Sequence, residues 1–203
     1  AGIMMPPYRE TDYGYESQWG VNYLGHFYLT GLLFEILKST ENSRVVTLSS
    51  LAHFKGNIFF DDVNRKDQYK PMESYRQSKL ACLIFAYELQ RRIEKNNLQM
   101  KSFASHPGVA ITNLLENGPR WIKILSPLLA WRLHSVANGA KPTLMAAMHP
   151  ELEGGEYLGP TGKRGMKGEP GITYSNSISK DTDIADRLWS LSEQQLDFKF
   201  SVG

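Results

Sequence analysis

Two residues of the sequence, Tyr75 and Lys79, have the types and the spacing of an acid–base pair. They lie four residues apart in a stretch with helical periodicity, so both side chains are expected on one face of a helix, about one turn apart. A phenol has a pKa near ~10 in water, and an adjacent ammonium group favours its ionised form and lowers that pKa. The pair is therefore suited to moving a proton to or from an alcohol or carbonyl oxygen. The spacing alone also occurs by chance in many helices.

Polar and glycine residues follow two predicted strands that flank this helix in the chain. The strand at residues 44–49 runs into Ser50, and the strand at 100–105 is followed by Pro107 and Gly108. The carboxyl ends of parallel strands are where α/β proteins place ligand-binding groups. We therefore expect these residues and the helix of the acid–base pair to meet in one crevice.

Helices and strands alternate along the chain, which predicts an α/β fold with a mainly parallel sheet. The predicted helices cover residues 16–38, 75–95, 136–148 and 181–195, and the predicted strands cover 44–49, 100–105 and 155–159. Residues 162–171 are expected to form a loop rich in glycine and lysine. A chain of 203 residues can bury one core, so we predict a single domain over residues 1–203. Only about three strands are found, which is few for a covered parallel sheet, so the fold is expected to be incomplete.

Bulk composition excludes several classes of function. A net charge of +2 without blocks of like charge gives no reason to expect a nucleic-acid partner. The five histidines lack ligand spacing, so no metal site is expected. Cys82 is the single cysteine and is expected to be a core residue in a reducing compartment. No signal peptide is visible and no apolar run approaches ~18 residues, so the prediction is a cytoplasmic protein.

Five segments, in order along the chain, together resemble the short-chain dehydrogenase/reductase family. They are Ala1-Gly2-Ile3, the end of an Asn-Asn-Ala-Gly segment; Val21-Asn22-Tyr23-Leu24-Gly25; Leu48-Ser49-Ser50, with the second serine in the catalytic position; Tyr75-Arg76-Gln77-Ser78-Lys79, a Tyr-x-x-x-Lys signature; and Pro107-Gly108-Val109-Ala110-Ile111-Thr112. The resemblance implies a Rossmann-like, doubly wound parallel sheet. It also implies hydride transfer between an NAD or NADP cofactor, with NADP favoured, and a small-molecule alcohol or carbonyl substrate.

The resemblance also implies a role for each matching residue. Tyr75 exchanges a proton with the substrate oxygen, and Lys79 lowers the Tyr75 pKa and binds the nicotinamide ribose. Ser50 holds the substrate oxygen, and Asn22 supports a water-linked proton relay to Lys79. The implied cofactor-binding residues are Ala1, Gly2, Asn22, Tyr75, Lys79, Pro107, Gly108, Ala110 and Thr112.

The finer resemblance is to the retinol-dehydrogenase-like branch, carried by Ser50-Leu51-Ala52-His53, Ser105-His106-Pro107-Gly108 and the ending at residues 185–192. It implies a lipophilic substrate and a substrate loop, or lid, within residues 109–150. The basic, Trp-rich segment 120–132 can instead be a helix packed on the core or a peripheral membrane contact. Related enzymes pair through the helices around Asn22 and Cys82, so a homo-oligomer is expected.

One departure from the family pattern limits these expectations. The glycine-rich turn that receives the cofactor pyrophosphate, and the family's first four strands, are absent from this sequence. The chain also opens at Ala1-Gly2 without a methionine, so we expect it to be the C-terminal, catalytic portion of a longer protein. Two alternatives stay open: a non-catalytic or truncated homologue that acts as a binding or scaffold protein, and an enzyme similar to protochlorophyllide reductases.

Overall fold

The computed structural model describes residues 2–109 and 135–203. Its α-helices and strands are α1 (Ser17–Trp19), α2 (Gly25–Ser39), β1 (Arg44–Leu48), α3 (Pro71–Lys95), β2 (Lys101–Ser105), α5 (Val136–Met148), β3 (Tyr157–Pro160), β4 (Pro170–Ile172) and α6 (Thr182–Leu196). A π-helical segment covers Gly20–Leu24, and 3-10 turns cover Leu51–Lys55, Lys163–Gly165 and Ile178–Lys180. The predicted helices and strands are all present.

The described strands form one sheet in the order β1-β2-β3-β4. Strands β1, β2 and β3 run parallel, and β4 pairs antiparallel with β3. The mainly parallel sheet is therefore confirmed. Strand β4 lies in the segment that was expected to be a loop. That expectation was wrong because Pro170 and Gly171 are residues that strands usually avoid. Its pairing with β3 is a tertiary contact that local sequence does not report.

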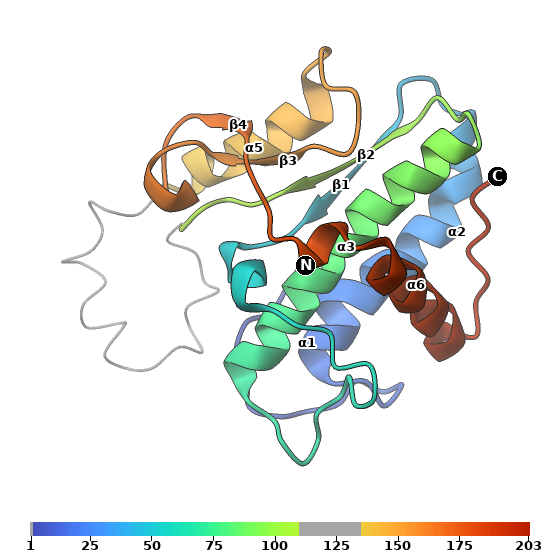
Figure 1. Ribbon diagram of the computed structural model, residues 1–203, viewed down its shortest axis with the longest axis vertical. Helices are drawn as coiled ribbons and strands as arrows, with labels where there is room; N and C mark the ends of the chain where they lie inside the picture. The colour runs from blue at the N-terminus through green and yellow to red at the C-terminus, as the bar shows by residue number, and fades with distance from the viewer. Residues whose placement is uncertain (1, 110–134) are drawn as a thin grey trace.

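Helices cover both faces of this sheet (Figure 1). Helix α3 packs against β1 and β2 on one face, and α5 packs against all four strands on the other. Helix α6 lies on the outer side of α3. This layering is the doubly wound, Rossmann-like arrangement that the sequence predicts, and it brings the carboxyl ends of β1 and β2 to the first turns of α3.

The first long helix is interrupted by a π-helical turn. Glu16 caps its start, because its carboxylate accepts hydrogen bonds from the backbone N–H groups of Gln18 and Trp19 at 2.9 Å each. The π-helical segment Gly20–Leu24 then joins α1 to α2. Such single-turn bulges often lie at functional sites, and this one contains Asn22.

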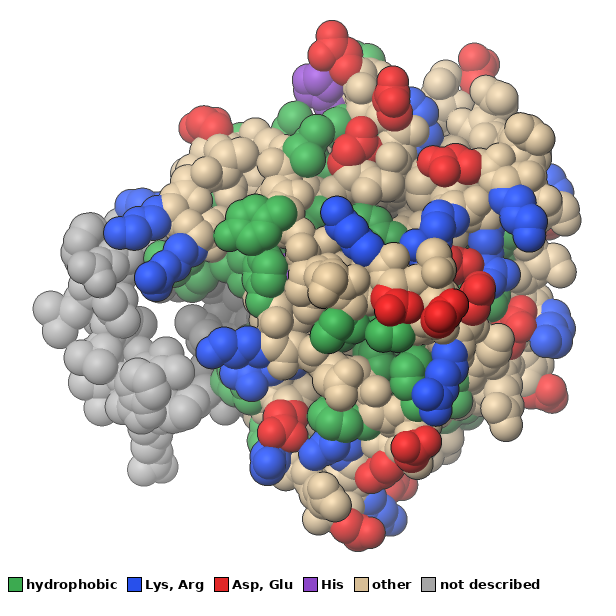
Figure 2. Space-filling view, in the orientation of Figure 1, with side chains coloured by type: hydrophobic (Ala, Val, Ile, Leu, Met, Phe, Trp, Pro, Cys, Tyr) green, Lys and Arg blue, Asp and Glu red, His purple; other side chains and the backbone are tan. Residues whose placement is uncertain are grey.

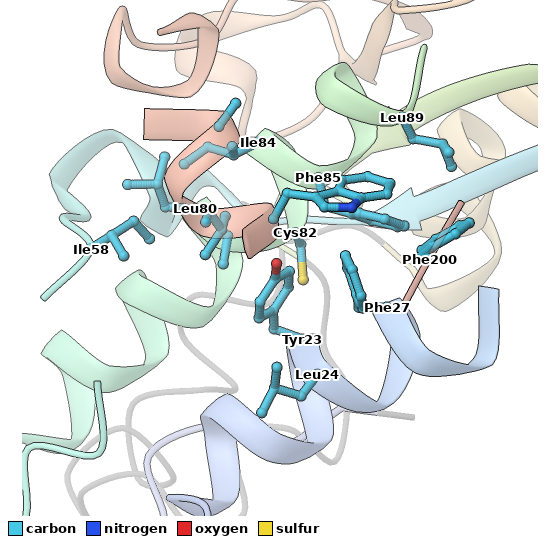
Figure 3. Packing of buried hydrophobic residues seen from close by; sticks show 14 of the residues in the cluster. Tyr23, Leu24, Phe27, Ile58, Leu80, Cys82, Ile84, Phe85, Leu89 and Phe200 are labelled. Carbon is cyan, nitrogen blue, oxygen red and sulfur yellow. The ribbon is translucent and has the colours of Figure 1, made fainter. Parts of the chain in front are cut away.

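Aromatic rings fill the core between α2, α3 and α6. Phe27 is fully buried, and its ring centroid lies 5.4 Å from that of Phe85, 5.0 Å from that of Trp189 and 5.3 Å from that of Phe200. Figure 3 shows Cys82 among these side chains, which agrees with its prediction as a core residue. Because α6 and the C-terminal segment cover α3, the helix that carries Tyr75 is held firmly against the sheet.

The surface has two notable features. Lys and Arg side chains are interspersed with Asp and Glu on the face that Figure 2 shows. Helix α2 exposes several large apolar side chains, which are Tyr28, Leu29, Leu32, Leu33 and Ile36.

Within residues 2–109 and 135–203, no helix is both long and apolar enough to span a bilayer.

Candidate active site

Helix α3 carries both members of the predicted acid–base pair at its N-terminal end. It begins at Pro71, four residues before Tyr75. Proline is well tolerated in the first turn of a helix, so this start is compatible with the sequence. Tyr75 and Lys79 are each only 5% exposed. The Lys79 ammonium donates a hydrogen bond to the carbonyl oxygen of Leu48, the last residue of β1, at 3.0 Å. Lys79 therefore lies at the carboxyl end of the strand, as the sequence predicts.

The two adjacent serines after β1 have different surroundings. Ser49 is buried, and its hydroxyl donates to the backbone carbonyl of Lys79 at 2.7 Å. Ser50 is half-buried, and its hydroxyl accepts from the Ala52 N–H at 3.2 Å. The same hydroxyl lies near enough to the Tyr75 phenol to lower its pKa. Because successive side chains of an extended segment point to opposite sides, only the second serine faces the tyrosine.

The pKa of Tyr75 differs from the expectation. Burial of the phenol raises its pKa above the ordinary value, and the nearby Ser50 hydroxyl opposes this rise only in part. Lys79 was expected to lower the pKa of Tyr75, but in this structure its ammonium is directed at the Leu48 carbonyl. Desolvation of the phenolate therefore outweighs the favourable charge.

Asn22 connects the π-helical segment to two other parts of the site. Its side-chain oxygen accepts from the Ile3 N–H at 2.8 Å, and its amide donates to the Ile3 carbonyl at 2.9 Å and to the Ser78 hydroxyl at 3.0 Å. The backbone carbonyl of Asn22 accepts a hydrogen bond from the Cys82 thiol at 3.1 Å. Asn22 is thus fully buried and hydrogen-bonded to helix α3 on both sides of Lys79.

Gly2 lies beside these groups. A Cβ atom built on Gly2 would be 3.5 Å from the Asn22 side-chain oxygen and 4.0 Å from the Lys79 ammonium nitrogen. Of the other residues predicted to bind cofactor, Ala1, Ala110 and Thr112 lie outside the described residues. The segment 120–132, with most of the predicted lid, also lies outside them. The part of the lid region from Val136 to Met148 is α5, which packs on the sheet.

The turn at Pro107 and Gly108 follows the carboxyl end of β2, and the two serines follow the carboxyl end of β1. Because these strands are parallel, both segments lie at the same edge of the sheet. Gly108 has a φ of +71°, where a side chain is strained, and a Cβ atom there would overlap the backbone of Met166. The next residue donates its N–H to the Met166 carbonyl at 2.9 Å. The turn is therefore held in a conformation that requires glycine at this position.

Three residues near this site had no predicted role: His53, His106 and Tyr157. Each is at most 2% exposed, and the ring centroid of Tyr157 lies 5.4 Å from that of His53 and 5.0 Å from that of His106. His53 and His106 belong to segments quoted for the resemblance, but sequence spacing does not show that both rings pack against Tyr157. In the described part of the chain, no group of three or more histidine, cysteine, aspartate or glutamate side chains is arranged to hold a metal ion.

Comparisons with known proteins agree with this geometry. The chain is 37% identical over 198 residues to human retinol dehydrogenase 14, 39% identical over 199 residues to human polyprenol dehydrogenase, and 33% identical over 207 residues to the chloroplastic short-chain dehydrogenase TIC 32 B of Brassica napus. These alignments cover 95%, 95% and 97% of the chain. A comparison with models of protein families finds no match.

A solved structure from Mycobacterium paratuberculosis, of a protein of uncharacterised function, superposes with a TM-score of 0.80 at 37% identity over 99% of this chain and 66% of that one. The carbonyl reductase Sniffer of D. melanogaster, at 14% identity and a TM-score of 0.50 over 83% of this chain and 63% of that one, shares the fold alone.

The fold and these relatives show a Rossmann-fold sequence, and the chain belongs to the short-chain dehydrogenase/reductase family. Within that family it belongs to the branch of the retinol dehydrogenases. The chain spans 56%, 58% and 62% of the length of the three curated relatives named above.

Proposed function

We propose that the protein containing this chain is an NAD(P)-dependent oxidoreductase that interconverts an alcohol and a carbonyl compound, with NADP favoured as cofactor. The observation that carries the proposal is the Lys79 ammonium bound to the Leu48 carbonyl at the carboxyl end of β1, with the Ser50 hydroxyl of the same strand end near enough to the Tyr75 phenol to lower its pKa. Two neighbouring hydroxyls at one strand end can both reach one substrate oxygen.

The proton transfer follows from these positions. Tyr75 donates its phenolic proton to a carbonyl oxygen during reduction and accepts it back during alcohol oxidation. Ser50 donates a hydrogen bond to the same oxygen and stabilises the negative charge that develops on it. Lys79, one helical turn from Tyr75, supplies a positive charge that opposes in part the unfavourable burial of the phenolate that remains.

The residues present fit the nicotinamide end of a cofactor. Gly2 leaves open the space beside Asn22 and Lys79 that a side chain would occupy, and Gly108 presents a backbone turn after β2. Lys79 has three N–H donors, and a single hydrogen bond from them, to Leu48, is seen among the described residues. When bound, the cofactor supplies or accepts the hydride. The pyrophosphate-binding turn belongs to a part of the family fold that this sequence does not contain.

A lipophilic alcohol is the proposed substrate class. Its support is the naming of two relatives as retinol dehydrogenase and polyprenol dehydrogenase. The lid prediction for residues 109–150 remains a proposal, and the described part of that range from Val136 to Met148 is α5, which packs on the sheet.

A matched pair of tyrosine variants tests the proposed reaction. In the intact protein, assayed with retinol and a polyprenol in the presence of NADP or NAD, Tyr75→Phe is expected to lower kcat by about 10²–10⁴-fold because it removes the proton donor. Tyr87→Phe is the control, since Tyr87 lies on the same helix and its hydroxyl contacts Ser175 at 3.0 Å.

Two outcomes contradict the proposal. Unchanged turnover in Tyr75→Phe would refute the role of the phenol. A wild-type protein that folds but turns over none of these alcohols or the corresponding aldehydes would favour the non-catalytic binding protein.

We also propose a homo-oligomer and a cytoplasmic location with peripheral membrane contact through residues 120–132. Support for the oligomer comes from the apolar side chains that α2 exposes at Leu29, Leu32 and Ile36, which are 54%, 55% and 65% exposed. Cys82 does not support it, because its face of α3 is covered within the chain itself. Sedimentation of Leu32→Glu beside the wild type tests the contact, and an unchanged oligomeric state would refute it.

A further inference from the structure

We propose that two buried histidines position the active site from behind in opposite tautomers: His53 holds the backbone of Ser50, and His106 holds the turn at Gly108. The kinetic part of this inference rests on the proposed function, whereas the tautomers follow from the contacts alone. Neither residue touches the space in front of Tyr75, so both are positioning residues.

The tautomer of His53 follows from its partner. Its Nδ1 lies 2.7 Å from the backbone carbonyl oxygen of Ser50, which can only accept, so Nδ1 must carry the proton. Its Nε2 is buried without a partner among the described residues. The backbone carbonyl of His53 in turn accepts from the Asn176 amide at 3.1 Å. His53 is therefore anchored from a distant segment and fixes the carbonyl of the residue that carries the proposed substrate-binding hydroxyl.

His106 has the opposite tautomer. Its Nδ1 accepts a hydrogen bond from the Gly108 N–H at 3.1 Å, so the proton of the neutral ring must be on Nε2. That nitrogen is buried without a partner in the described part of the chain, and the ring lies so close to Gly159 that a Cβ there would overlap it. Gly159 thus makes room for the ring that holds the turn at Gly108.

Tyr157 joins the two rings into one cluster. Its hydroxyl oxygen lies 3.4 Å from the Nδ1 of His53, and its ring packs at 45° against His106 with centroids 5.0 Å apart. The titratable groups that face His106 from the neighbouring elements are His53 and Tyr157, and neither is negatively charged. Burial lowers the pKa of both histidines, so both rings are neutral at neutral pH.

This arrangement gives each ring one defined task. A proton added to His106 would go to Nδ1 and displace the Gly108 N–H, and a proton added to His53 would go to a nitrogen with no acceptor. Tyr157 lies in β3, His106 directly follows β2, and His53 lies shortly after β1; the three strands are paired side by side. We therefore expect movement of one ring to change the spacing between Ser50 and the Gly108 turn.

Nitrogen-15 spectra of the histidine rings test the tautomers without any assay of activity. The long-range ¹H–¹⁵N correlations of the chain at neutral pH are expected to show His53 protonated at Nδ1 and His106 protonated at Nε2. The same tautomer in both rings, or a charged ring in either, would overturn the inference.

Amide substitutions then separate positioning from packing. Asparagine places an amide near the position of Nδ1, whereas glutamine places it near Nε2. His53→Asn can still donate to the Ser50 carbonyl, and His106→Asn can still accept from the Gly108 N–H. The glutamine variants His53→Gln and His106→Gln lose these contacts but keep a polar side chain of similar size.

The kinetic expectation differs for the two positions. In the intact protein, His53→Gln lowers kcat at least about tenfold with little change in the KM for cofactor, because Ser50 acts on the reacting oxygen. His106→Gln raises the KM for cofactor at least about tenfold, because the Gly108 turn faces the nicotinamide end. Each asparagine variant stays within about threefold of the wild type.

The outcomes remain distinguishable from failure of the proposed function. If the wild type is inactive, the proposed function fails, while the nitrogen-15 spectra still decide the tautomers. Equal losses in the asparagine and glutamine variants of either residue, with circular dichroism showing all four folded, would overturn the positioning role.

Discussion

The side-chain amide of Asn22 donates a hydrogen bond to the hydroxyl of Ser78 at 3.0 Å, and Ser78 directly precedes Lys79. The same side chain makes two further hydrogen bonds to the backbone of Ile3. One residue of the π-helical segment therefore connects the N-terminal segment at Ile3 to helix α3. This connection leads to the first prediction.

Replacing Asn22 with leucine, which has nearly the same shape, is expected to destabilise the chain strongly. Each lost hydrogen bond leaves a buried partner unpaired, so the expected decrease in the free energy of unfolding is roughly 2–4 kcal/mol. Urea unfolding followed by circular dichroism measures it. Ser78→Ala removes one of the three contacts and should cost clearly less; an equal cost would contradict the account.

Ser49 and Ser50 should respond differently to the same substitution. Ser49→Ala removes the buried hydrogen bond to the Lys79 carbonyl, which lowers the free energy of unfolding by about 1 kcal/mol. Ser50→Ala leaves the core intact but lowers kcat by about 10²–10³-fold, because it removes a donor to the substrate oxygen. Denaturant titration and steady-state kinetics of both variants measure the difference. The reverse pattern would show that the first serine is the functional one.

Gly108→Ala is expected to cost more than the same change at Gly14. Both glycines have positive φ, +71° and +78°, so alanine adds about 1–2 kcal/mol of backbone strain at either position. At Gly108 the new Cβ also overlaps the Met166 backbone, whereas at Gly14 no atom lies within 4 Å. Thermal unfolding compares the two variants, and equal losses would mean that the loop around Met166 moves freely.

The stability of the chain should fall as pH decreases toward 4 because of His106. Burial, with a smaller contribution from His53, lowers the pKa of His106 from 6.5 to about 4. Between these two values the unfolded chain binds the proton and the folded chain does not, so unfolding becomes easier as the pH falls. The expected loss of folding stability from His106 is on the order of 3 kcal/mol, and it is complete near pH 4.

The pH dependence has a matched control. Urea titrations between pH 7 and pH 4 should show a shallower decline in His106→Asn, which retains an acceptor for the Gly108 N–H but cannot titrate. An identical decline in the variant would assign the effect to other groups, of which His53 is the first candidate because its pKa is also lowered by burial.

Cys82 should be unreactive in the folded chain. The thiol is fully buried, donates a hydrogen bond to the Asn22 carbonyl at 3.1 Å and has its pKa raised by burial. Because the thiolate is the reactive form, iodoacetamide is expected to label the residue only after unfolding in urea. Labelling at the same rate in the native chain would contradict this burial.

Local sequence was sufficient where the information is short-range. The four-residue spacing of Tyr75 and Lys79 determined that they share one helical face, and the apolar periodicity around them indicated a long helix. The periodicity did not place its first residue at Pro71, and it did not reveal the π-helical turn at Asn22, because both depend on how this part of the chain packs on its neighbours.

Strand β4 and the direction of the Tyr75 pKa show the limit of that information. Pro170 and Gly171 carry no strand preference, and they pair with β3 only because the sheet is already there. The sequence places an ammonium near the phenol, but the pKa depends on how completely water is removed from the phenol, and that removal comes from surrounding segments.

The sequence by itself located the residues on which the proposed chemistry rests: a phenol and an ammonium one turn apart, hydroxyls after one strand and a glycine turn after the next. The family resemblance had already assigned the catalytic position to Ser50. Only the tertiary structure showed that Ser49 is bound to the Lys79 carbonyl instead, and that His53 and His106 both pack against Tyr157. The physical reason is that residue types and spacings are local, whereas burial, tautomers and pKa shifts are set by contacts between segments far apart in the chain.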